Sequence, residues 1–315
     1  MRRFLILVIL FGLIIVATLA LGEAAIRCAQ NPYKYKHEWM QQHAAEVETL
    51  IMGSSLGYYD IEPAMIENSF CLADNSQTFK YDLLLLKQYR PLAQNLKRVM
   101  IMVGYCSFFD AVLDVGPEWY YAINYKLYMG INEHSWLSKF GCELWHPSVY
   151  SGKLRSLLLG GEDLMCDSLG HGRNFSHDRR LDDIVASSET AIARHTAANW
   201  DAVAQNTADF EALIKWCIDE KIEPMIVLPP VCKAYRDRVD ARQLSEMYRI
   251  LNATTAKFGI TYHDYYADPR FTDEDFYDAD HLTNDLGAAK FTRLMTNDFN
   301  PDTNSDSDFE KFREL

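Results

Sequence analysis

Two short stretches, far apart in the chain, carry residue types that together can perform nucleophilic chemistry. The first is a Gly-Ser-Ser turn that follows an apolar run and ends at Ser55, and the second is an Asp-Ala-Asp-His segment that ends at His281. A serine hydroxyl becomes a useful nucleophile when a histidine takes its proton and an acid orients that histidine. We therefore expect Ser55 as nucleophile, His281 as general base and Asp278 as the acid.

Other assignments within the same two stretches remain open at this level. Ser54 is the second hydroxyl of the turn, although its side chain is better placed to support the turn than to react. Asp275 and Asp280 are alternatives to Asp278. The choice depends on which carboxylate reaches the second ring nitrogen of the histidine, and only a fold can decide it.

The turn also fits the Gly-x-Ser-x-Gly pattern, from Gly53 to Gly57, of the nucleophile elbow in α/β-hydrolases. In that fold several strands precede the elbow, whereas a single strand of the globular part precedes Ser55. An acid three residues before the histidine is also not the usual layout there. We therefore do not favour the α/β-hydrolase fold.

Apolar runs that end in polar residues alternate with helical patterns along the chain. Strands are expected at residues 47–52, 70–73, 98–103, 224–228 and 260–266, and helices at 81–89, at 241–258 and from residue 283 or 284 onward. Pro91 and Gly259 end the first two of these helices. The alternation predicts an α/β fold in which helices cover both faces of one parallel sheet. Ligands bind such a sheet at the carboxyl ends of its strands, where Ser55 and the loop with His281 can meet.

The N-terminus begins with an apolar run without charges, residues 4–21, preceded by Arg2 and Arg3. The run is long enough to span a hydrocarbon core of roughly 30 Å, and the basic pair favours a cytoplasmic N-terminus. A cleaved signal peptide is the alternative, but its apolar core is usually shorter, at about 7–15 residues. We expect a cytoplasmic stub and transmembrane anchor over 1–21, then a polar stalk over 22–45 that lifts the rest of the chain off the bilayer.

The remaining chain is expected to form one α/β domain over residues 46–298, with an aromatic-rich insertion at about 110–182 and an acidic tail over 299–315. The large rings of the insertion are Trp119, Tyr120, Tyr121, Tyr125, Tyr128, Trp136, Phe140, Trp145 and Tyr150. Sugars stack on such rings, so a carbohydrate-binding cap is one interpretation. A secondary core under long loops is the more common one.

Composition excludes several classes of function. The formal net charge of −13 disfavours nucleic acid as a partner, because long-range steering would be repulsive. The seven cysteines include no Cys-x-x-Cys pair and no Cys/His cluster at metal spacing. We therefore expect neither a metal site nor a cofactor, and the disulfide status of the cysteines stays open.

The paired motifs resemble those of the GDSL or SGNH hydrolase superfamily, and within it the membrane-anchored extracytoplasmic members that have Gly-Ser-Ser in place of Gly-Asp-Ser. The resemblance rests on GSSLGYYDIEP at 53–63, NSFCLADNSQ at 68–77 and DFYDADHLTNDLGAAKF at 275–291. It covers roughly residues 47–75, 98–110, 223–230 and 260–295, and leaves out the middle third of the chain.

The resemblance implies a three-layer sandwich around a parallel, flavodoxin-like five-stranded sheet, with Ser55 as nucleophile and Asp278 and His281 as acid and base. It implies a serine esterase or O-acyltransferase, facing the periplasm or the cell exterior, that acts on acyl esters of cell-envelope or extracellular glycans through an acyl-serine intermediate. Some such proteins accompany O-acylation of cell-surface polymers, so a membrane-bound acyltransferase is an expected partner.

Two departures from the family pattern concern the oxyanion hole. The second block lacks its glycine, so the Ser55 N–H and a backbone N–H of Asn75 or Ser76 are the expected donors. The third block lacks its asparagine, and its Tyr105, Cys106 and Ser107 are expected to border the substrate cleft. Losing one oxyanion donor costs about 10²–10³ in rate. A catalytically weak or inactive glycan-binding scaffold is therefore the alternative function, and a cell-envelope protein with structural Ser and His is a third.

Overall fold

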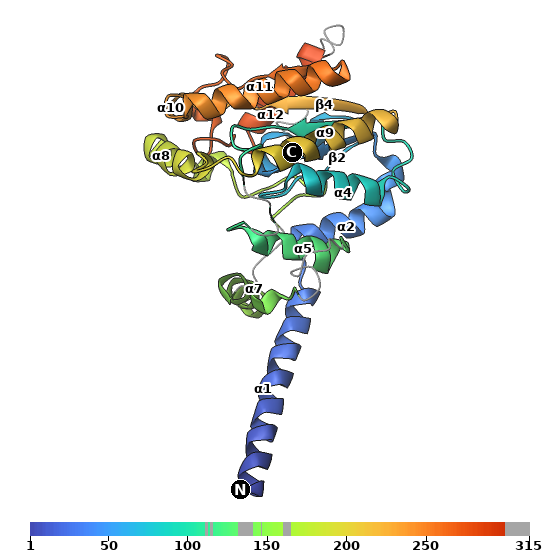
Figure 1. Ribbon diagram of the computed structural model, residues 1–315, viewed down its shortest axis with the longest axis vertical. Coiled ribbons are helices and arrows are strands. Elements are labelled where there is room, and N and C mark those ends of the chain that lie inside the picture. The colour runs from blue at the N-terminus through green and yellow to red at the C-terminus, as the bar shows by residue number, and fades with distance from the viewer. Residues whose placement is uncertain (111–112, 114–115, 132–140, 146, 160–164, 300–315) are drawn as a thin grey trace.

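A five-stranded, all-parallel sheet lies between two layers of helices in the computed structural model, which describes residues 1–110, 113, 116–131, 141–145, 147–159 and 165–299 (Figure 1). The strands are β1 (Thr49–Met52), β2 (Ser69–Cys71), β3 (Arg98–Met102), β4 (Glu223–Leu228) and β5 (Tyr262–Asp264). Their order is β2-β1-β3-β4-β5, so the expected flavodoxin-like sheet is confirmed. Each of the five expected apolar runs contributes one strand.

Successive residues of each strand enter cores on opposite faces of the sheet, as the two-residue period of a strand requires. In β1, Leu50 and Met52 belong to one buried cluster and Ile51 to the other. The first cluster is closed by α2 (Pro32–His43), α4 (Phe79–Tyr89), α9 (Val203–Asp219) and α11 (Ala241–Phe258), and the second by α3 (Ser55–Asp60), α10 (Lys233–Arg236) and α12 (Gly287–Phe299). The three-layer sandwich is thereby confirmed.

The helix ends follow from local capping. The expected helices at 81–89 and 241–258 are present as α4 and α11. Asp240 caps α11 by accepting the N–H groups of Arg242 and Gln243, and Gly259 ends the helix with a φ of 65°. The last helix begins at Gly287, later than expected, and the Thr283 hydroxyl accepts the Gly287 N–H at 2.9 Å.

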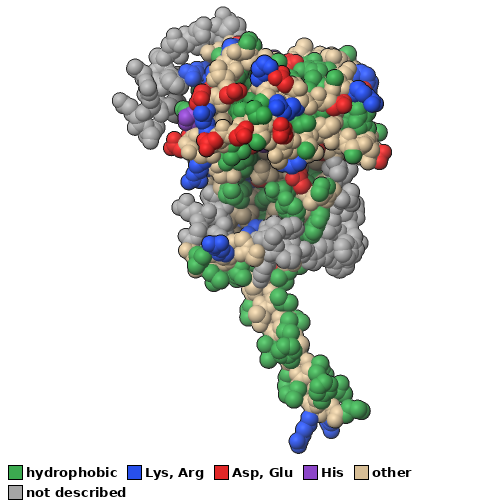
Figure 2. Space-filling model, turned by 90° about the vertical axis from the view of Figure 1, so that its left-hand side faces the viewer, with side chains coloured by type: hydrophobic (Ala, Val, Ile, Leu, Met, Phe, Trp, Pro, Cys, Tyr) green, Lys and Arg blue, Asp and Glu red, His purple; other side chains and the backbone are tan. Residues whose placement is uncertain are grey.

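One long apolar helix, α1 (Arg2–Cys28), projects from the α/β unit (Figure 1). Apolar side chains cover it along its length, with basic side chains at its tip (Figure 2). The helix is long and apolar enough to cross a membrane, and its most apolar 18 residues are not buried against the rest of the described chain. These properties suit a signal anchor and a signal peptide alike.

The expected stalk over 22–45 is wrong in its second half, which is part of the folded domain. Helix α2 buries Tyr33 and Met40 in the core under the sheet. Lys36 is fully buried, and its ammonium donates to the Ala73 carbonyl and to Asp74 Oδ2, the latter at 3.1 Å. A polar, weakly amphipathic sequence is stable in this position because its one buried charge has a paired carboxylate.

The insertion adds α5 (Trp119–Met129) and α7 (Pro147–Leu159) to the domain, and α8 (Ile184–His195) follows it. Tyr125 and Tyr128 of α5 are buried in the main core, and the Tyr125 hydroxyl donates to Gln77 at 2.7 Å. These two rings therefore form core rather than an open sugar platform. Trp136 and Phe140 lie outside the described residues, as do the side chains of Trp145 and Tyr150 and the tail beyond residue 299.

Candidate functional site

The turn between β1 and α3 places Ser55 at the carboxyl edge of the sheet. Gly53 has a φ of 117°, and a Cβ there would meet the Met102 Cβ and carbonyl oxygen at 3.1 Å, so the tight turn depends on glycine. Its N–H donates to Asp82 Oδ1 at 3.1 Å. Ser55 is the first residue of α3 and is half-buried, so its side chain stays within reach of solvent.

Ser55, His281 and Asp278 form a chain of hydrogen bonds at the carboxyl edge of the sheet. His281 Nε2 is 2.8 Å from Ser55 Oγ, and His281 Nδ1 is 3.0 and 3.2 Å from the two oxygens of Asp278. Asp278 Oδ1 also accepts the backbone N–H groups of Asp280 and His281, which holds the carboxylate in place. Because a carboxylate accepts, Nδ1 carries a proton and Nε2 of the neutral ring can accept the Ser55 proton.

The geometry discriminates among the alternative residues. The nearest oxygen of Asp280 is 3.7 Å from His281 Nδ1, beyond hydrogen-bond length. The Asp275 carboxylate has other partners: it accepts the Thr272 N–H at 2.8 Å and forms an ion pair with Lys290 at 2.7 Å. Ser54 is the residue that precedes α3. Ser55 and Asp278 are therefore the residues that bond to the imidazole.

The electrostatic environment stabilises the charged imidazole. Burial lowers the pKa of His281, but the nearby carboxylates of Asp278 and Asp280 outweigh it and raise this pKa above its ordinary value. Burial works in the opposite sense on the Asp278 carboxyl, and the neighbouring His281 outweighs it and lowers the pKa of Asp278. The pair therefore favours an ionised Asp278 beside a protonated His281, the charge state that follows proton transfer from serine.

Asp60 ties the end of α3 to the loop that carries His281. Its side chain is fully buried, and Oδ1 accepts the Leu282 N–H at 2.9 Å. Its other oxygen has no hydrogen-bond partner within the described part of the chain, and burial raises the pKa of Asp60 well above its ordinary value. Asp60 thus fixes the backbone beside His281.

Three stacked aromatic rings form a wall beside the imidazole. Phe175 lies between Tyr59 and Tyr277, with ring centroids 3.9 Å and 4.1 Å away. Phe175 and Tyr59 both meet the His281 ring edge-on, at 5.2 and 5.9 Å. The insertion therefore contributes to the site through Phe175, which the sequence did not single out.

The expected oxyanion donors differ in availability. The Ser55 N–H, at the first position of α3, has no acceptor within its own helix. The Asn75 N–H is already donated to Asp74 Oδ1 at 2.9 Å, so it is not free to serve. Ser76 adopts a φ of 58°, and its N–H has no acceptor among the residues described. Ser55 and Ser76 remain the backbone candidates.

Hydrogen bonds within the protein hold Tyr105 and Ser107 of the third block. Tyr105 is buried, and its hydroxyl accepts the Asp240 N–H at 3.0 Å and bonds to Thr196. The Ser107 hydroxyl accepts the Gly104 N–H at 2.9 Å and closes the turn. Partners just before α11 and just after α8 thus fix the Tyr105 hydroxyl, and the assignment of Tyr105, Cys106 and Ser107 to a substrate cleft stays a prediction.

Cys106 is the member of this block whose thiol is influenced by nearby carboxylates. Its side chain is half-buried. Burial raises the pKa of its thiol, and the carboxylates of Asp110 and Asp280 raise it further. A thiol in this environment stays protonated and is a poor nucleophile.

Asp82 and Gln77 support the turn from the other face of the sheet, and sequence reasoning missed both. Asp82 Oδ1 accepts from the Gly53 N–H and from Gln77 Nε2, at 3.1 and 2.6 Å. Asp82 is an acid within the largely apolar helix α4. This position in the sequence is the signal that could have indicated a structural role for Asp82. The two residues join the β1 turn to the loop that carries Ser76.

All seven cysteines have free thiols, so no disulfide crosses the described structure.

No protein-family model matches the chain, and no curated protein matches it.

Proposed function

We propose that this protein is a serine esterase or O-acyltransferase of the SGNH type that acts on acyl esters of cell-envelope or extracellular glycans. The observation that carries the proposal is the 2.8 Å contact between His281 Nε2 and Ser55 Oγ, with Asp278 on the opposite ring nitrogen. The parallel sheet in the order β2-β1-β3-β4-β5 is the fold that the sequence resemblance calls for.

In the proposed reaction, Ser55 Oγ attacks the acyl carbonyl while His281 Nε2 takes its proton. The oxyanion of the tetrahedral intermediate is stabilised by the N–H groups of Ser55 and Ser76. The intermediate collapses to an acyl-Ser55, and His281 returns the proton to the departing alcohol. Water or a glycan hydroxyl then attacks the acyl-enzyme, with His281 as base again, and the serine is released.

The surroundings of the site support a substrate that is neutral and ring-shaped. The wall formed by Tyr59, Phe175 and Tyr277 offers aromatic surface beside the base, and sugar rings stack on such surfaces. The formal net charge of −13 would repel a densely anionic polymer. A neutral acylated glycan is compatible with both features.

We further propose that α1 is retained as a membrane anchor with the catalytic domain on the periplasmic or outer side. Arg2 and Arg3 at the tip of the apolar helix favour a cytoplasmic N-terminus. A membrane-bound acyltransferase is then a natural partner, because both proteins would share one bilayer. Retention of residues 1–21 in the mature protein, measured by intact-mass analysis of the membrane fraction, tests this point.

The activity is tested with p-nitrophenyl acetate and the purified full chain in detergent micelles. We expect release of p-nitrophenol, and the addition of an oligosaccharide acceptor distinguishes transfer from hydrolysis by the appearance of acetylated sugar. No release above that of the His281→Gln variant would contradict the proposal.

A non-catalytic glycan-binding scaffold is the second candidate function. It is favoured by the oxyanion region, because the Asn75 and Gly104 N–H groups are both donated within the protein, to Asp74 Oδ1 and to the Ser107 hydroxyl. Such a protein would bind acylated oligosaccharide without turning it over, and the binding would survive Ser55→Ala.

The activity is expected to rise with pH along a limb set by His281. Only the neutral imidazole can accept the serine proton, and the raised pKa of His281 places that limb above pH of about 6.5, the ordinary value for histidine. Asp280→Asn removes one of the carboxylates that raise this pKa. The limb should therefore move to lower pH, with a several-fold gain in kcat/KM near neutrality.

The measurement is the pH profile of kcat/KM for the full chain and for Asp280→Asn. Asp182→Asn is the matched control, because Asp182 is exposed and the change of charge is the same. A limb that stays in place in Asp280→Asn, or moves equally in the control, would show that Asp280 does not tune the base.

A further inference from the structure

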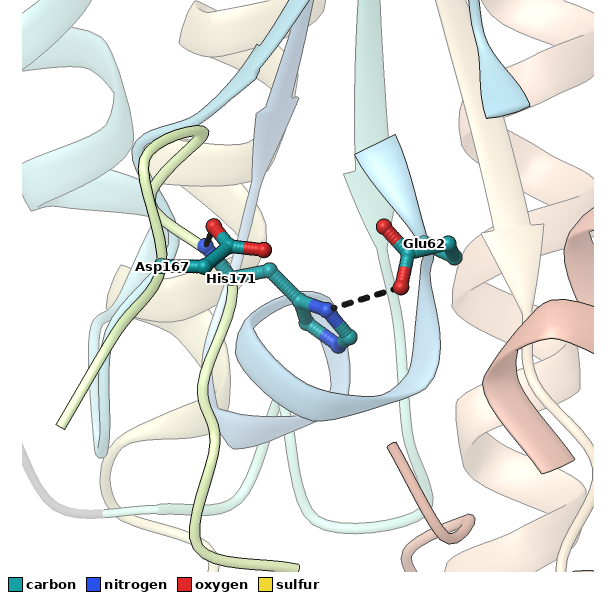
Figure 3. Close-up of side chains that lie close together, drawn as sticks. All are labelled: Glu62, Asp167 and His171. Carbon is teal, nitrogen blue, oxygen red and sulfur yellow. Dashed lines mark hydrogen bonds and ion pairs between the residues drawn. The ribbon is translucent and has the colours of Figure 1, made fainter. Parts of the chain in front are cut away.

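The segment at residues 165–173 folds back on itself and packs against β2 and the end of α3. Its Leu169 carbonyl accepts the Cys71 N–H at 2.9 Å, which covers the outer edge of β2. Its Gly172 N–H donates to the Tyr58 carbonyl at 2.8 Å. The segment thereby brings two of its own side chains, Asp167 and His171, opposite Glu62, two residues after the end of α3 (Figure 3).

His171 is fully buried and has one ring nitrogen without a hydrogen-bond partner. Nε2 lies 2.9 Å from the Tyr59 carbonyl oxygen, and because a carbonyl only accepts, Nε2 must carry a hydrogen and donate it. In the neutral ring the lone pair is then on Nδ1. This atom is buried and accepts no hydrogen bond from any residue that the structure describes.

One carboxylate lies against that lone pair, and a second is close by. Glu62 Oε2 is 3.4 Å from His171 Nδ1, and ligand atoms of Glu62, Asp167 and His171 all lie within 4.8 Å of one another. Figure 3 shows the imidazole between the two acids, which come from different segments. The Nδ1 lone pair and Glu62 Oε2 repel each other unless a positive charge lies between them, so this pair calls for either a proton on Nδ1 or a metal ion.

The spacing fits a metal ion better than a proton. A charge-assisted N–H···O bond is about 2.7–2.9 Å long, shorter than the 3.4 Å between His171 Nδ1 and Glu62 Oε2. Neighbouring ligands of a tetrahedral zinc, each at about 2.0–2.2 Å from the ion, lie about 3.4 Å apart. The separation of His171 Nδ1 and Glu62 Oε2 therefore matches that of two neighbouring zinc ligands, and the ligand atom of Asp167 lies within 4.8 Å of both residues' ligand atoms.

Backbone N–H groups also hold both carboxylates in orientation, as hydrogen bonds usually do for metal ligands. Glu62 Oε1 accepts the Ala64 N–H at 3.1 Å, which leaves Oε2 directed at the histidine. Asp167 Oδ1 accepts the N–H groups of Leu169 and His171, at 2.8 and 3.0 Å. Its Oδ2 is paired with the exposed Arg173 at 3.1 Å, an ion pair that a bound cation would compete with or share.

We propose that Glu62, Asp167 and His171 form a binding site for a divalent transition-metal ion, with zinc as the best-fitting ion. One imidazole and two carboxylates match the nitrogen and oxygen ligands that zinc accepts, and a water would complete the tetrahedron. The two negative charges balance the ion. This site is separate from Ser55 and His281 and does not rest on the proposed function.

The second group of acids around a histidine, at Asp278 and Asp280, lacks this signature. Both ring nitrogens of His281 have partners, Asp278 at 3.0 Å and Ser55 at 2.8 Å. No lone pair is left facing a carboxylate there. A metal is therefore called for at His171 and not at His281.

The ion would act as a structural clamp. It would join the segment at 165–173 to the end of α3, and this segment runs on into Phe175, which stacks on Tyr59 beside His281. The sequence predicted no metal site because Glu62 lies far from the other two ligands along the chain.

The test is zinc binding by the full-length chain in detergent micelles, free of any affinity tag and stripped with a chelator. Titration of zinc chloride against a chromophoric chelator should show one saturable site per chain. At zinc concentrations of about 100 times the dissociation constant, the thermal midpoint should rise by about 5–10 °C.

Two variants remove one ligand each with little change of shape. His171→Gln keeps an amide donor for the Tyr59 carbonyl but loses Nδ1, and Glu62→Gln keeps an acceptor for the Ala64 N–H. Each should weaken zinc binding by at least about 100-fold. Glu67→Gln, at an exposed acid five residues after Glu62, should bind zinc as the unmodified chain does.

Two results would overturn the proposal. One is the absence of saturable zinc binding and of a thermal shift in the unmodified chain, as expected if Nδ1 holds a proton. The other is equal zinc binding by the unmodified chain and by Glu62→Gln and His171→Gln. Because binding and unfolding are measured without substrate, neither result bears on the proposed function.

Discussion

Replacing Ser55 by alanine should abolish ester hydrolysis, with a loss in kcat on the order of 10⁴–10⁶-fold. The variant removes the hydroxyl that His281 Nε2 contacts at 2.8 Å, so neither the acyl-enzyme nor proton transfer to the imidazole can occur. Stability should change little, since Ser55 is half-buried and its bond to His281 is the one that is lost. The measurement is the rate of p-nitrophenol release from p-nitrophenyl acetate under saturating substrate.

Ser54→Ala is the matched control for this prediction. The two serines are adjacent and carry the same group, but Ser54 precedes α3, and the hydroxyl that meets the base is that of Ser55. Ser54→Ala should keep most of the activity. Equal activity in both variants would remove Ser55 as the nucleophile, and a loss confined to Ser54→Ala would exchange their roles.

Replacing Lys36 by methionine should cost about 3–5 kcal/mol of unfolding free energy. Lys36 is fully buried, with Asp74 Oδ2 at 3.1 Å and the Tyr58 ring centroid at 4.2 Å from its ammonium. Burial opposes the charge of Lys36, but Asp74 outweighs it and raises its pKa. The variant leaves Asp74 buried and unpaired. Urea unfolding of the full chain, followed by tryptophan fluorescence, measures the effect.

Two further variants separate charge loss from packing. Lys34→Met, on the same helix, removes an ammonium whose bond to the Cys28 carbonyl is exposed, and it should cost little. Adding Asp74→Asn to Lys36→Met removes the unpaired charge and should restore most of the lost stability. Lys36→Met that unfolds like the unmodified chain would contradict the role given to this pair.

The Lys36 variant should also lower activity, because Asp74 begins the loop that carries Ser76. Asp74 Oδ1 accepts the Asn75 N–H, and its Oδ2 is held by Lys36. A loop released from α2 would position the Ser76 N–H less well for an oxyanion. Helix α2 thus links the base of α1 to the candidate site.

The sheet and the Ser55–His281 pair could be predicted from sequence because their signals are local or follow from topology. Each strand is a short apolar run with a polar end, and the sheet gathers all those ends at one edge. Asp278 and His281 are neighbours in sequence, so their contact depends on one loop. The meeting of Ser55 with His281 follows from the shared edge of the sheet and not from a local pattern.

The residues that sequence analysis misjudged depend on distant partners. Residues 32–43 looked like a polar stalk, because the burial of Lys36 makes sense only beside Asp74. The role of Phe175 depends on the docking of the insertion against α3, which no local pattern encodes.

The most direct test of the central claim is covalent labelling by a fluorophosphonate probe, which reacts with a serine activated by a neighbouring base. After labelling of the full chain in micelles and proteolysis, mass spectrometry should find the adduct on Ser55, and His281→Gln should prevent its formation. An adduct on another residue, or no adduct on the unmodified chain at a pH where the imidazole is neutral, would contradict a catalytic Ser55–His281–Asp278 arrangement.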